Sequence, residues 1–258
     1  MSAKKIKRRE AIVELTQHQG SVSVDELAVR LDVSAQTIRR DINDLCELNV
    51  LRRRHGGAEL FEKQLNMPYD LRATTNSRAK RAVAQAAAER IPDGATIFLS
   101  IGSTPMEVAQ ALRPRKHLTL ITNNLNAAMA LSHETTNRII LPGGELRLPD
   151  RDFLGSDVID LFRGYRAEFG IFGVAGVAED GALLDFHATE VAVREAIREA
   201  STTSILVLDH TKFGRLAPAV GGNIADLDLV ISDKAPERTY LPALEPLGDS
   251  FLTSGGRP

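Results

Sequence analysis

Short apolar segments alternate with helical segments over most of the chain beyond residue 76. The apolar segments lie at 96–99, 118–122, 138–141, 169–174, 204–209 and 227–232, and the helical segments lie at 77–90, 104–112, 124–132, 154–164 and 187–200. Strands that are separated by helices favour parallel pairing, because each connection must cross the sheet and its helix covers one face. The sequence therefore predicts the α/β class, with a Rossmann-like parallel sheet over residues 76–252.

The N-terminal 60 residues begin with three helical segments, predicted at 5–18, at 24–31 and from Ser34 onward. Apolar residues recur at helical spacing in the first segment. Ser23 precedes the second segment and Glu26 follows three residues later, which is the spacing of a capping box. Three short helices in this order are typical of a helix-turn-helix module.

A hairpin follows the third helix. Residues 51–60 alternate around the pair Gly56-Gly57, which suits a tight turn between two strands. Three helices and a hairpin predict a winged helix-turn-helix domain over residues 1–60. Residues 61–75 lack periodicity, so we interpret them as a linker to the α/β domain.

The third helix has one apolar face and one polar face. Ser34 is placed to cap it, and Ile38, Ile42 and Leu45 form a stripe at i, i+4 and i+7. The opposite face carries Gln36, Thr37, Arg39 and Arg40. In a major groove arginine suits a guanine edge and glutamine suits an adenine edge. This helix therefore predicts double-stranded DNA as a partner.

Positive charge gathers on both sides of this helix in the sequence. Residues 1–60 carry 11 Lys and Arg against 9 Asp and Glu, although the chain as a whole has a net charge of −2. A run of charged residues usually forms only a solvent-exposed face of the protein. Two runs of basic residues, at 4–9 and 52–55, flank the helix whose polar face suits base edges. This placement favours contact of the basic side chains with DNA phosphates or with the minor groove. The residues predicted to contact DNA are Ser34, Gln36, Thr37, Arg39, Arg40, Arg52, Arg54 and His55.

Composition excludes several other classes of protein. The single cysteine, Cys46, cannot form an internal disulfide, and no Cys or His spacing suits a metal, so we expect neither a metal nor a cofactor. No signal peptide and no apolar run of membrane-spanning length occur. We therefore expect a cytoplasmic protein with no membrane partner.

Polar and glycine-rich turns follow several of the predicted strands. They include Gly102-Ser103-Thr104 at a helix start, Asn123, the pair Gly143-Gly144, and the segment 209–215. Ligands of parallel sheets bind beyond the carboxyl ends of the strands, and a helix start with free N–H groups suits an anion such as phosphate. Each turn alone is equally compatible with an ordinary capped turn. Their common placement predicts a ligand site for a phosphorylated compound.

Two further pairings leave alternatives open. Glu190 and Arg194 stand at i and i+4, which suits either an ion pair on the helix surface or a ligand contact. Asp209 and Glu168 could pair with Lys212 as an acid/base set. Such a set leaves a second interpretation of the chain open, namely a sugar-phosphate isomerase-like enzyme with an appended DNA-binding module.

The chain resembles the DeoR family of bacterial sugar-metabolism repressors along nearly its whole length. The matching motifs are VSAQTIRRD at 33–41, RHGGA at 54–58, GST at 102–104, TNN at 122–124, GGEL at 143–146 and DHTKFG at 209–214. The resemblance is greatest to the branch that controls glycerol 3-phosphate metabolism. It implies a DNA-binding repressor of a carbohydrate or glycerol operon, a homo-oligomer (dimer or tetramer), and a sensor domain similar to ribose-5-phosphate isomerase-type folds.

The resemblance also implies an effector and the residues that bind it. Family members are released from operator DNA by phosphorylated sugars or polyols, and here the effector would be glycerol 3-phosphate. Many members have Asp at the positions of Ser100 and Glu168, and this difference affects how ligand hydroxyls would be accepted. The residues predicted to bind effector are Gly102, Ser103, Thr104, Asn123, Gly143, Gly144, Glu168 and Lys212.

Overall fold

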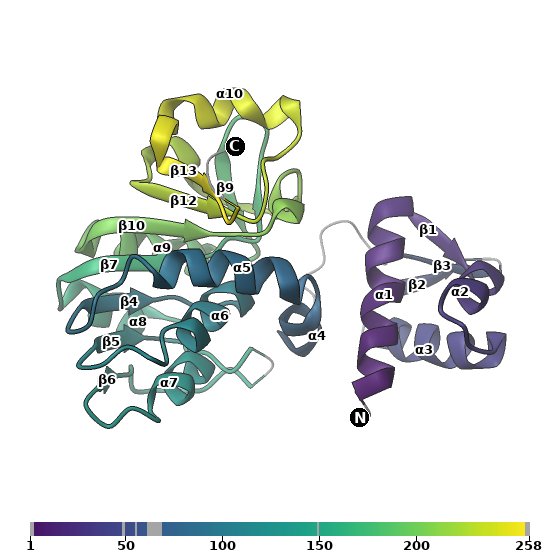
Figure 1. The fold of residues 1–258 in the computed structure, drawn as a ribbon, viewed down its shortest axis with the longest axis horizontal. Helices are drawn as coiled ribbons and strands as arrows, with labels where there is room; N and C mark the ends of the chain where they lie inside the picture. The colour runs from purple at the N-terminus through teal and green to yellow at the C-terminus, as the bar shows by residue number, and fades with distance from the viewer. Residues whose placement is uncertain (1–2, 48–49, 55, 61–68, 149, 256–258) are drawn as a thin grey trace. The chain divides into compact units, whose positions relative to one another are not determined.

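The computed structural model describes residues 3–47, 50–54, 56–60, 69–148 and 150–255 (Figure 1). The chain divides into two compact units, Met1–Thr75 and Asn76–Pro258. Each unit has its own hydrophobic core and is described by itself.

The first unit contains three helices and a small antiparallel sheet. The helices α1 (Ala3–Gln19), α2 (Val24–Arg30) and α3 (Ala35–Glu47) precede the hairpin of β2 (Leu51–Arg54) and β3 (Gly57–Leu60). A three-residue strand, β1 (Ser21–Ser23), pairs with the outer side of β3. The helices and the wing were predicted from sequence, and β1 was not, because three residues carry no detectable alternation.

Both predicted serine caps of this unit are present. The Ser23 hydroxyl accepts a hydrogen bond from the Glu26 amide (3.1 Å), and the Ser34 hydroxyl accepts one from the Thr37 amide (3.2 Å). The predicted apolar stripe of α3 lies in the core of the unit. The caps set where α2 and α3 begin, and the stripe sets which face of α3 remains in solvent.

The wing turns tightly because of its glycines. Arg54 pairs with Gly57, so two residues connect the strands, and Gly56 has a φ of 77° that a glycine adopts without strain. A Cβ at Gly57 would lie 2.0 Å from the Val22 carbonyl oxygen. Glycine is therefore required here for β1 to approach β3.

A short helix lies within the segment that we interpreted as a linker. α4 (Tyr69–Thr74) occupies part of residues 61–75, and Leu71 packs against the core of the first unit. Six residues are too few to show a helical period in the sequence. Residues 61–68 lie outside the described part of the chain.

The second unit is built on a parallel sheet of seven strands in its described part. Their order is β13-β12-β10-β7-β4-β5-β6, and every paired register in the sheet is parallel. The strands are β4 (Thr96–Leu99), β5 (Thr119–Thr122), β6 (Arg138–Ile140), β7 (Ala167–Phe172), β10 (Ser201–Val207), β12 (Leu229–Ser232) and β13 (Phe251–Thr253). This confirms the predicted α/β class with a parallel sheet.

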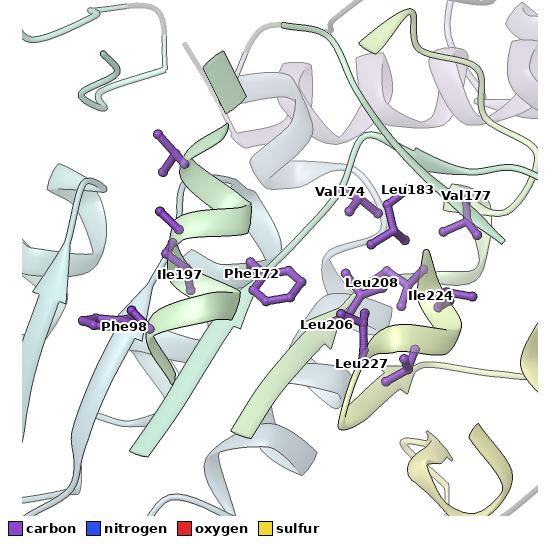
Figure 2. Close-up of a cluster of buried hydrophobic side chains, with 14 of the residues drawn as sticks. Phe98, Phe172, Val174, Val177, Leu183, Ile197, Leu206, Leu208, Ile224 and Leu227 are labelled. Carbon is purple, nitrogen blue, oxygen red and sulfur yellow. The ribbon is translucent and has the colours of Figure 1, made fainter. Parts of the chain in front are cut away.

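Helices cover both faces of this sheet. One cluster contains residues of α5 (Ser77–Ala88), α6 (Ser103–Ala111) and α7 (Leu125–Leu131), and the other contains residues of α8 (Ser156–Arg163) and α9 (Ala188–Ala200). Ile171 faces the first cluster and its neighbour Phe172 the second, as alternation along a strand requires. Figure 2 shows Phe98, Phe172 and Ile197 in the second cluster.

A second, antiparallel sheet was not predicted from sequence. It has the order β11-β9-β8 and contains β8 (Gly176–Val177), β9 (Ala182–Asp185) and β11 (Ala219–Asn223). The C-terminal segment adds α10 (Leu241–Leu244) and strand β13. Further short 3-10 helices are His210–Lys212, Ile224–Asp226, Arg238–Tyr240 and Glu245–Ser250.

Part of the basic N-terminal run has a structural role. Arg8 and Arg9 of α1 pair with Asp41 of α3, at 2.5 and 3.4 Å, and Arg9 also pairs with Asp44. Lys5 pairs with Asp44 at 2.9 Å. These three cations therefore hold α1 against α3, which corrects the interpretation of the whole run 4–9 as a phosphate-binding cluster.

We expect Asp41→Ala to destabilise the first unit by about 3–5 kcal/mol, because Arg8 and the buried Arg9 would both lose the buried carboxylate that they share, and only Asp44 would remain to pair with Arg9. Asp41 is only 1% exposed. Amide hydrogen exchange of α3 measures the effect, since exchange through unit opening accelerates as the unit loses stability. Lys5→Ala, which removes an exposed pair, is the control and should cost about 0–1 kcal/mol. Equal exchange in the two variants would contradict a structural role for Asp41.

Candidate DNA-binding surface and ligand site

The polar face of α3 presents two arginines to solvent. Gln36, Arg39 and Arg40 are exposed, and neither arginine forms a hydrogen bond or ion pair with any residue that the structure describes. Thr37 is half-buried, and its hydroxyl lies 2.9 Å from that of Ser34 at the helix start. The helix therefore offers two unpaired cations beside an amide side chain.

The wing carries arginines on both of its faces. Arg52 and Arg54, both predicted to contact DNA, share one face, and their side chains are 59% and 63% exposed. Arg53 points the other way and donates a hydrogen bond to the Asn43 side chain of α3. That hydrogen bond joins the wing to α3. His55, also predicted to contact DNA, lies outside the described residues.

An acidic residue lies between the two arginines of the outer face. Glu59 of β3 pairs with Arg52 (Nε–Oε1, 2.6 Å) and with Arg54 (Nη1–Oε2, 3.7 Å). Sequence analysis did not identify Glu59, although the hairpin register places it opposite Arg52. Its carboxylate partly neutralises the face of the wing that was predicted to meet phosphates.

The turn after β4 leads into the N-terminus of α6. Gly102 has a φ of 115°, which favours glycine, and precedes Ser103 at the helix start. Ser103 and Thr104 are 8% and 5% exposed, and neither hydroxyl forms a hydrogen bond with a described residue. Two unsatisfied hydroxyls at the positive end of a helix dipole suit an anion.

The adjacent β5 turn holds the β4 turn in place. Asn124 caps α7, and its amide Nδ2 donates to the carbonyls of Ser100 (3.3 Å) and Gly102 (3.4 Å). Thr122 donates to the Leu99 carbonyl at 2.5 Å. These bonds fix the backbone before α6, so Asn124 positions the anion-suited turn.

Asn123, which was predicted to lie near the ligand, is fully buried. Its Nδ2 donates to the Phe153 carbonyl at 2.8 Å, and the Phe153 amide donates to the Asn123 carbonyl at 3.0 Å. These bonds tie β5 to the loop that follows β6. Its Oδ1 is buried without a hydrogen-bond partner among the described residues.

The loop after β10 holds a buried carboxylate among cations. Asp209 is 1% exposed and accepts hydrogen bonds from the amide and hydroxyl of Thr211. Burial raises its pKa, but the charges of Lys212 and Lys80 and the Thr211 hydrogen bonds outweigh burial and lower the pKa overall. Asp209 is therefore ionised, and it holds the 3-10 turn that carries Lys212.

Three of the predicted effector residues lie away from the turn that carries Lys212. Gly143 and Gly144 follow β6, the edge strand, and both are exposed. Glu168 is at the amino end of β7, where its carboxylate accepts a hydrogen bond from the Thr96 amide at 3.0 Å. Because the other turns lie at the carboxyl ends, the placement of Glu168 in the ligand site is wrong.

The same geometry removes the predicted acid/base set. Glu168 and Asp209 come from opposite ends of parallel strands, so they cannot act together with Lys212. Of the two alternatives left open for Glu190 and Arg194, the ion pair on the helix surface does not form. Arg194 is 2% exposed, and it binds Asp185 (3.1 Å), Glu195 and the Gly221 carbonyl. Burial raises the pKa of Asp185 to about 6 despite the Arg194 charge.

Glu190 belongs instead to an ion cluster that sequence analysis missed. Its carboxylate accepts the amides of Phe186 and His187 at the start of α9, and it lies 3.4 Å from Arg147. Arg147 also binds Asp152 through two bonds of 2.8 Å, which raise the arginine pKa. The cluster links the loop after β6 to α9. Contacts across 43 residues leave no local sequence signal.

Two searches of the described residues complete the site. No helix there is long and apolar enough to cross a membrane. No group of three or more His, Cys, Asp or Glu side chains in that part of the chain could hold a metal ion.

Comparison with known proteins agrees with this geometry. Residues 8–64 match the DeoR-like helix-turn-helix domain, and residues 75–234 match the DeoR C terminal sensor domain. The chain belongs to the DeoR family. It is 43% identical to the glycerol-3-phosphate regulon repressor of Escherichia coli (strain K12) over 93% of this chain and 96% of that protein. It is 40% identical to the Haemophilus influenzae protein of the same name over 89% and 90%.

Membership in this family assigns the class of activity. The DeoR-family chain is a DNA-binding transcriptional repressor, the activity for which three of its curated relatives are named. Among solved structures, ribose 5-phosphate isomerase A of Methanocaldococcus jannaschii is similar at 17% identity and a TM-score of 0.41, over 55% of this chain and 56% of that one. A similarity this distant does not indicate a function for this chain.

We expect Glu59→Gln to tighten binding to any duplex, because Arg52 and Arg54 would no longer be shared with a carboxylate. An exposed pair is worth up to about 1 kcal/mol, so the gain should be roughly fivefold or less. The dependence of log affinity on log salt should steepen by about one unit. Fluorescence anisotropy over a salt series measures both, with Asp25→Asn as a control of equal charge. An unchanged slope would mean that the wing does not meet phosphates.

Proposed function

We propose that this DeoR-family protein represses genes of glycerol 3-phosphate use and leaves its operator when that metabolite, or a closely similar phosphorylated polyol, binds the second unit. The observation that carries the proposal is the start of α6, where Ser103 and Thr104 are mostly buried residues whose hydroxyls form no hydrogen bond with a described residue. A phosphate would satisfy both hydroxyls and the free N–H groups of the helix.

DNA recognition is assigned to the polar face of α3. Arg39 and Arg40 are exposed and unpaired within the described chain, so they can contact bases or phosphates without first breaking an ion pair. Ser34, Gln36 and Thr37 lie at the N-terminal end of the helix, the end that enters the major groove in such modules. Arg52 and Arg54 add contacts to the flanking backbone.

A second copy of the chain completes the operator complex in this proposal. A dimer, or a tetramer made of two dimers, would present two α3 helices to half-sites about 34 Å apart or a multiple of that distance. Binding to a chromosomal operator requires the protein to act in the cytoplasm.

The effector is assigned from charge and from the relatives. Phosphate would lie at Gly102, Ser103 and Thr104, and the ammonium group of Lys212 would attract it. Arg147 is already bound by Asp152 and Glu190, so the loop after β6 offers little free positive charge for a second phosphate. A ligand with one phosphate and a hydroxylated remainder suits this balance. Glycerol 3-phosphate has that composition, and two relatives are named for its regulon.

Release follows from linkage between the two sites. An effector that binds the DNA-incompetent arrangement more tightly shifts the population away from the operator by that difference in affinity. DNA must weaken effector binding by the same factor.

We expect Arg40→Ala to cost about 1–3 kcal/mol on operator DNA and clearly less on a random duplex, because a bidentate contact to guanine carries sequence information. Fluorescence anisotropy at fixed salt on both duplexes measures the two losses. Arg30→Ala, which removes an exposed arginine from α2, is the control. Equal losses on the two duplexes would assign Arg40 to a phosphate.

We expect glycerol 3-phosphate to release the wild-type protein from a duplex of its own upstream region, with ribose 5-phosphate, fructose 6-phosphate and inorganic phosphate as comparison ligands. Ser103→Asp should bind the duplex normally and resist release, because its carboxylate would repel the phosphate. Ser156→Asp makes the same change at another helix start that follows a glycine, and it should be released normally. Normal release of Ser103→Asp would exclude the α6 start as the phosphate site.

A further inference from the structure

The first residue of the second unit is hydrogen-bonded to the loop that carries Lys212. The Asn76 side chain donates from Nδ2 to the Asp209 carboxylate at 3.2 Å and to the Thr211 hydroxyl at 3.3 Å. These contacts join residues 133 and 135 positions apart in the sequence. Thr211 in turn donates its hydroxyl to Asp209, so the three side chains form a closed triangle.

The backbone of Asn76 is held in an uncommon conformation. Its φ and ψ are 53° and 30°, in the left-handed region, and asparagine adopts that region more readily than most residues do. Asn76 precedes α5, but its side chain does not cap that helix. The side-chain amide of Asn76 therefore donates its hydrogen bonds to Asp209 and Thr211, and the side chain makes no hydrogen bond to the start of α5.

A second residue of α5 reinforces this connection. Lys80, one turn further along, is 4% exposed, and its charge helps to lower the pKa of Asp209. The Lys80 charge also acts on Glu107 of α6, the helix that begins at Ser103. The first turn of α5 and the residue before it therefore contribute a charge and an amide to the turn that holds Lys212.

On its other side, Asn76 follows the last residue of the DNA-binding unit. Thr75 closes α4 with two hydrogen bonds to the Leu71 carbonyl, from its amide (3.0 Å) and from its hydroxyl (2.8 Å). Leu71 packs in the core of that unit. Thr75 and Asn76 are consecutive residues, so a change in the Asn76 backbone reaches α4 along the chain.

We infer that Asn76 is the positioning residue through which the effector site controls the DNA-binding unit. Phosphate bound near Lys212 draws that side chain away from Asp209 and shifts the 3-10 turn. The hydrogen bonds from Asn76 then follow Asp209 and Thr211, and the Asn76 backbone passes the shift to Thr75 and α4. The inference rests on the proposed function, because it takes the Lys212 turn as part of the effector site.

The principal test is Asn76→Gly, since glycine keeps the left-handed backbone and removes only the side chain. Saturating glycerol 3-phosphate should weaken operator binding of the wild type by about tenfold or more, within the usual range of coupling. In the variant the weakening should fall below about twofold. Isothermal titration should give the same affinity of the two free proteins for glycerol 3-phosphate, within about twofold, because Asn76 does not touch the ligand.

Two further variants separate coupling from a general loss of rigidity. His117→Gly places glycine at another left-handed position, in the turn before β5, and should respond like the wild type. Asn76→Asp keeps the size of the side chain but sets a carboxylate against Asp209, so it should also lose the response. Normal release of Asn76→Gly and Asn76→Asp would overturn the inference.

Hydrogen exchange tests the connection without relying on the identity of the effector. Operator binding should change the exchange of residues 209–213 in the wild type and leave it unchanged in Asn76→Gly, since coupling is reciprocal. If glycerol 3-phosphate fails to release the wild type but this change occurs, the proposed effector is wrong and the role of Asn76 stands. If operator binding leaves 209–213 unchanged in the wild type, or alters it equally in the variant, the role of Asn76 is overturned.

Discussion

The parallel pairing of β4 with β5 and β7 is the constraint on which the ligand site depends. It brings the carboxyl ends of these strands to one edge of the sheet, so the α6 start lies beside the turn that contains Asn124. Asn124 then holds two carbonyls of the β4 turn and leaves the N–H groups of α6 free. Replacing Ser103 and Thr104 by apolar residues would keep this architecture and remove the two hydroxyls that we propose to bind phosphate. The backbone fold therefore forms the turn, and the hydroxyls of Ser103 and Thr104 supply the hydrogen-bonding groups that the proposed phosphate would contact.

Both units use buried carboxylates to join distant segments. Asp41 ties α1 to α3 in the first unit, and Asp185 with Arg194 ties α9 to the antiparallel sheet in the second. Asp209 ties the turn after β10 to the start of α5. Such groups contribute little net stability because desolvation offsets attraction, yet an unpaired charge is costly. Their effect is therefore to favour one arrangement of the segments, and for Asp209 we propose that this arrangement responds to a bound anion.

Local features of the sites could be predicted from sequence, and contacts across the fold could not. The caps at Ser23 and Ser34, the polar face of α3 and the turn at Gly102 depend on residues within one helical turn of each other. Glu168 was misplaced because a strand sequence does not show which end of the strand meets the ligand edge. A surface ion pair stayed open for Arg194 because helical spacing does not show what packs over that face of α9. Asn76, Glu59 and Arg147 have partners that only the folded chain brings near.

The sequence by itself determined the order of helices and strands, the parallel class of the sheet, and the residues that the recognition helix exposes. These follow from hydrophobic period, turn residues and capping, which act over a few neighbouring positions. The tertiary structure alone decided that Glu59 pairs with the arginines of the wing and that Asn76 reaches Asp209. It also decided that Lys5, Arg8 and Arg9 bind carboxylates of α3 and hold α1 against that helix, which keeps them from pairing with DNA phosphates. The physical reason is that charge pairing depends on distance in space, and distance in space between remote residues is set only when the sheet and its helices have packed.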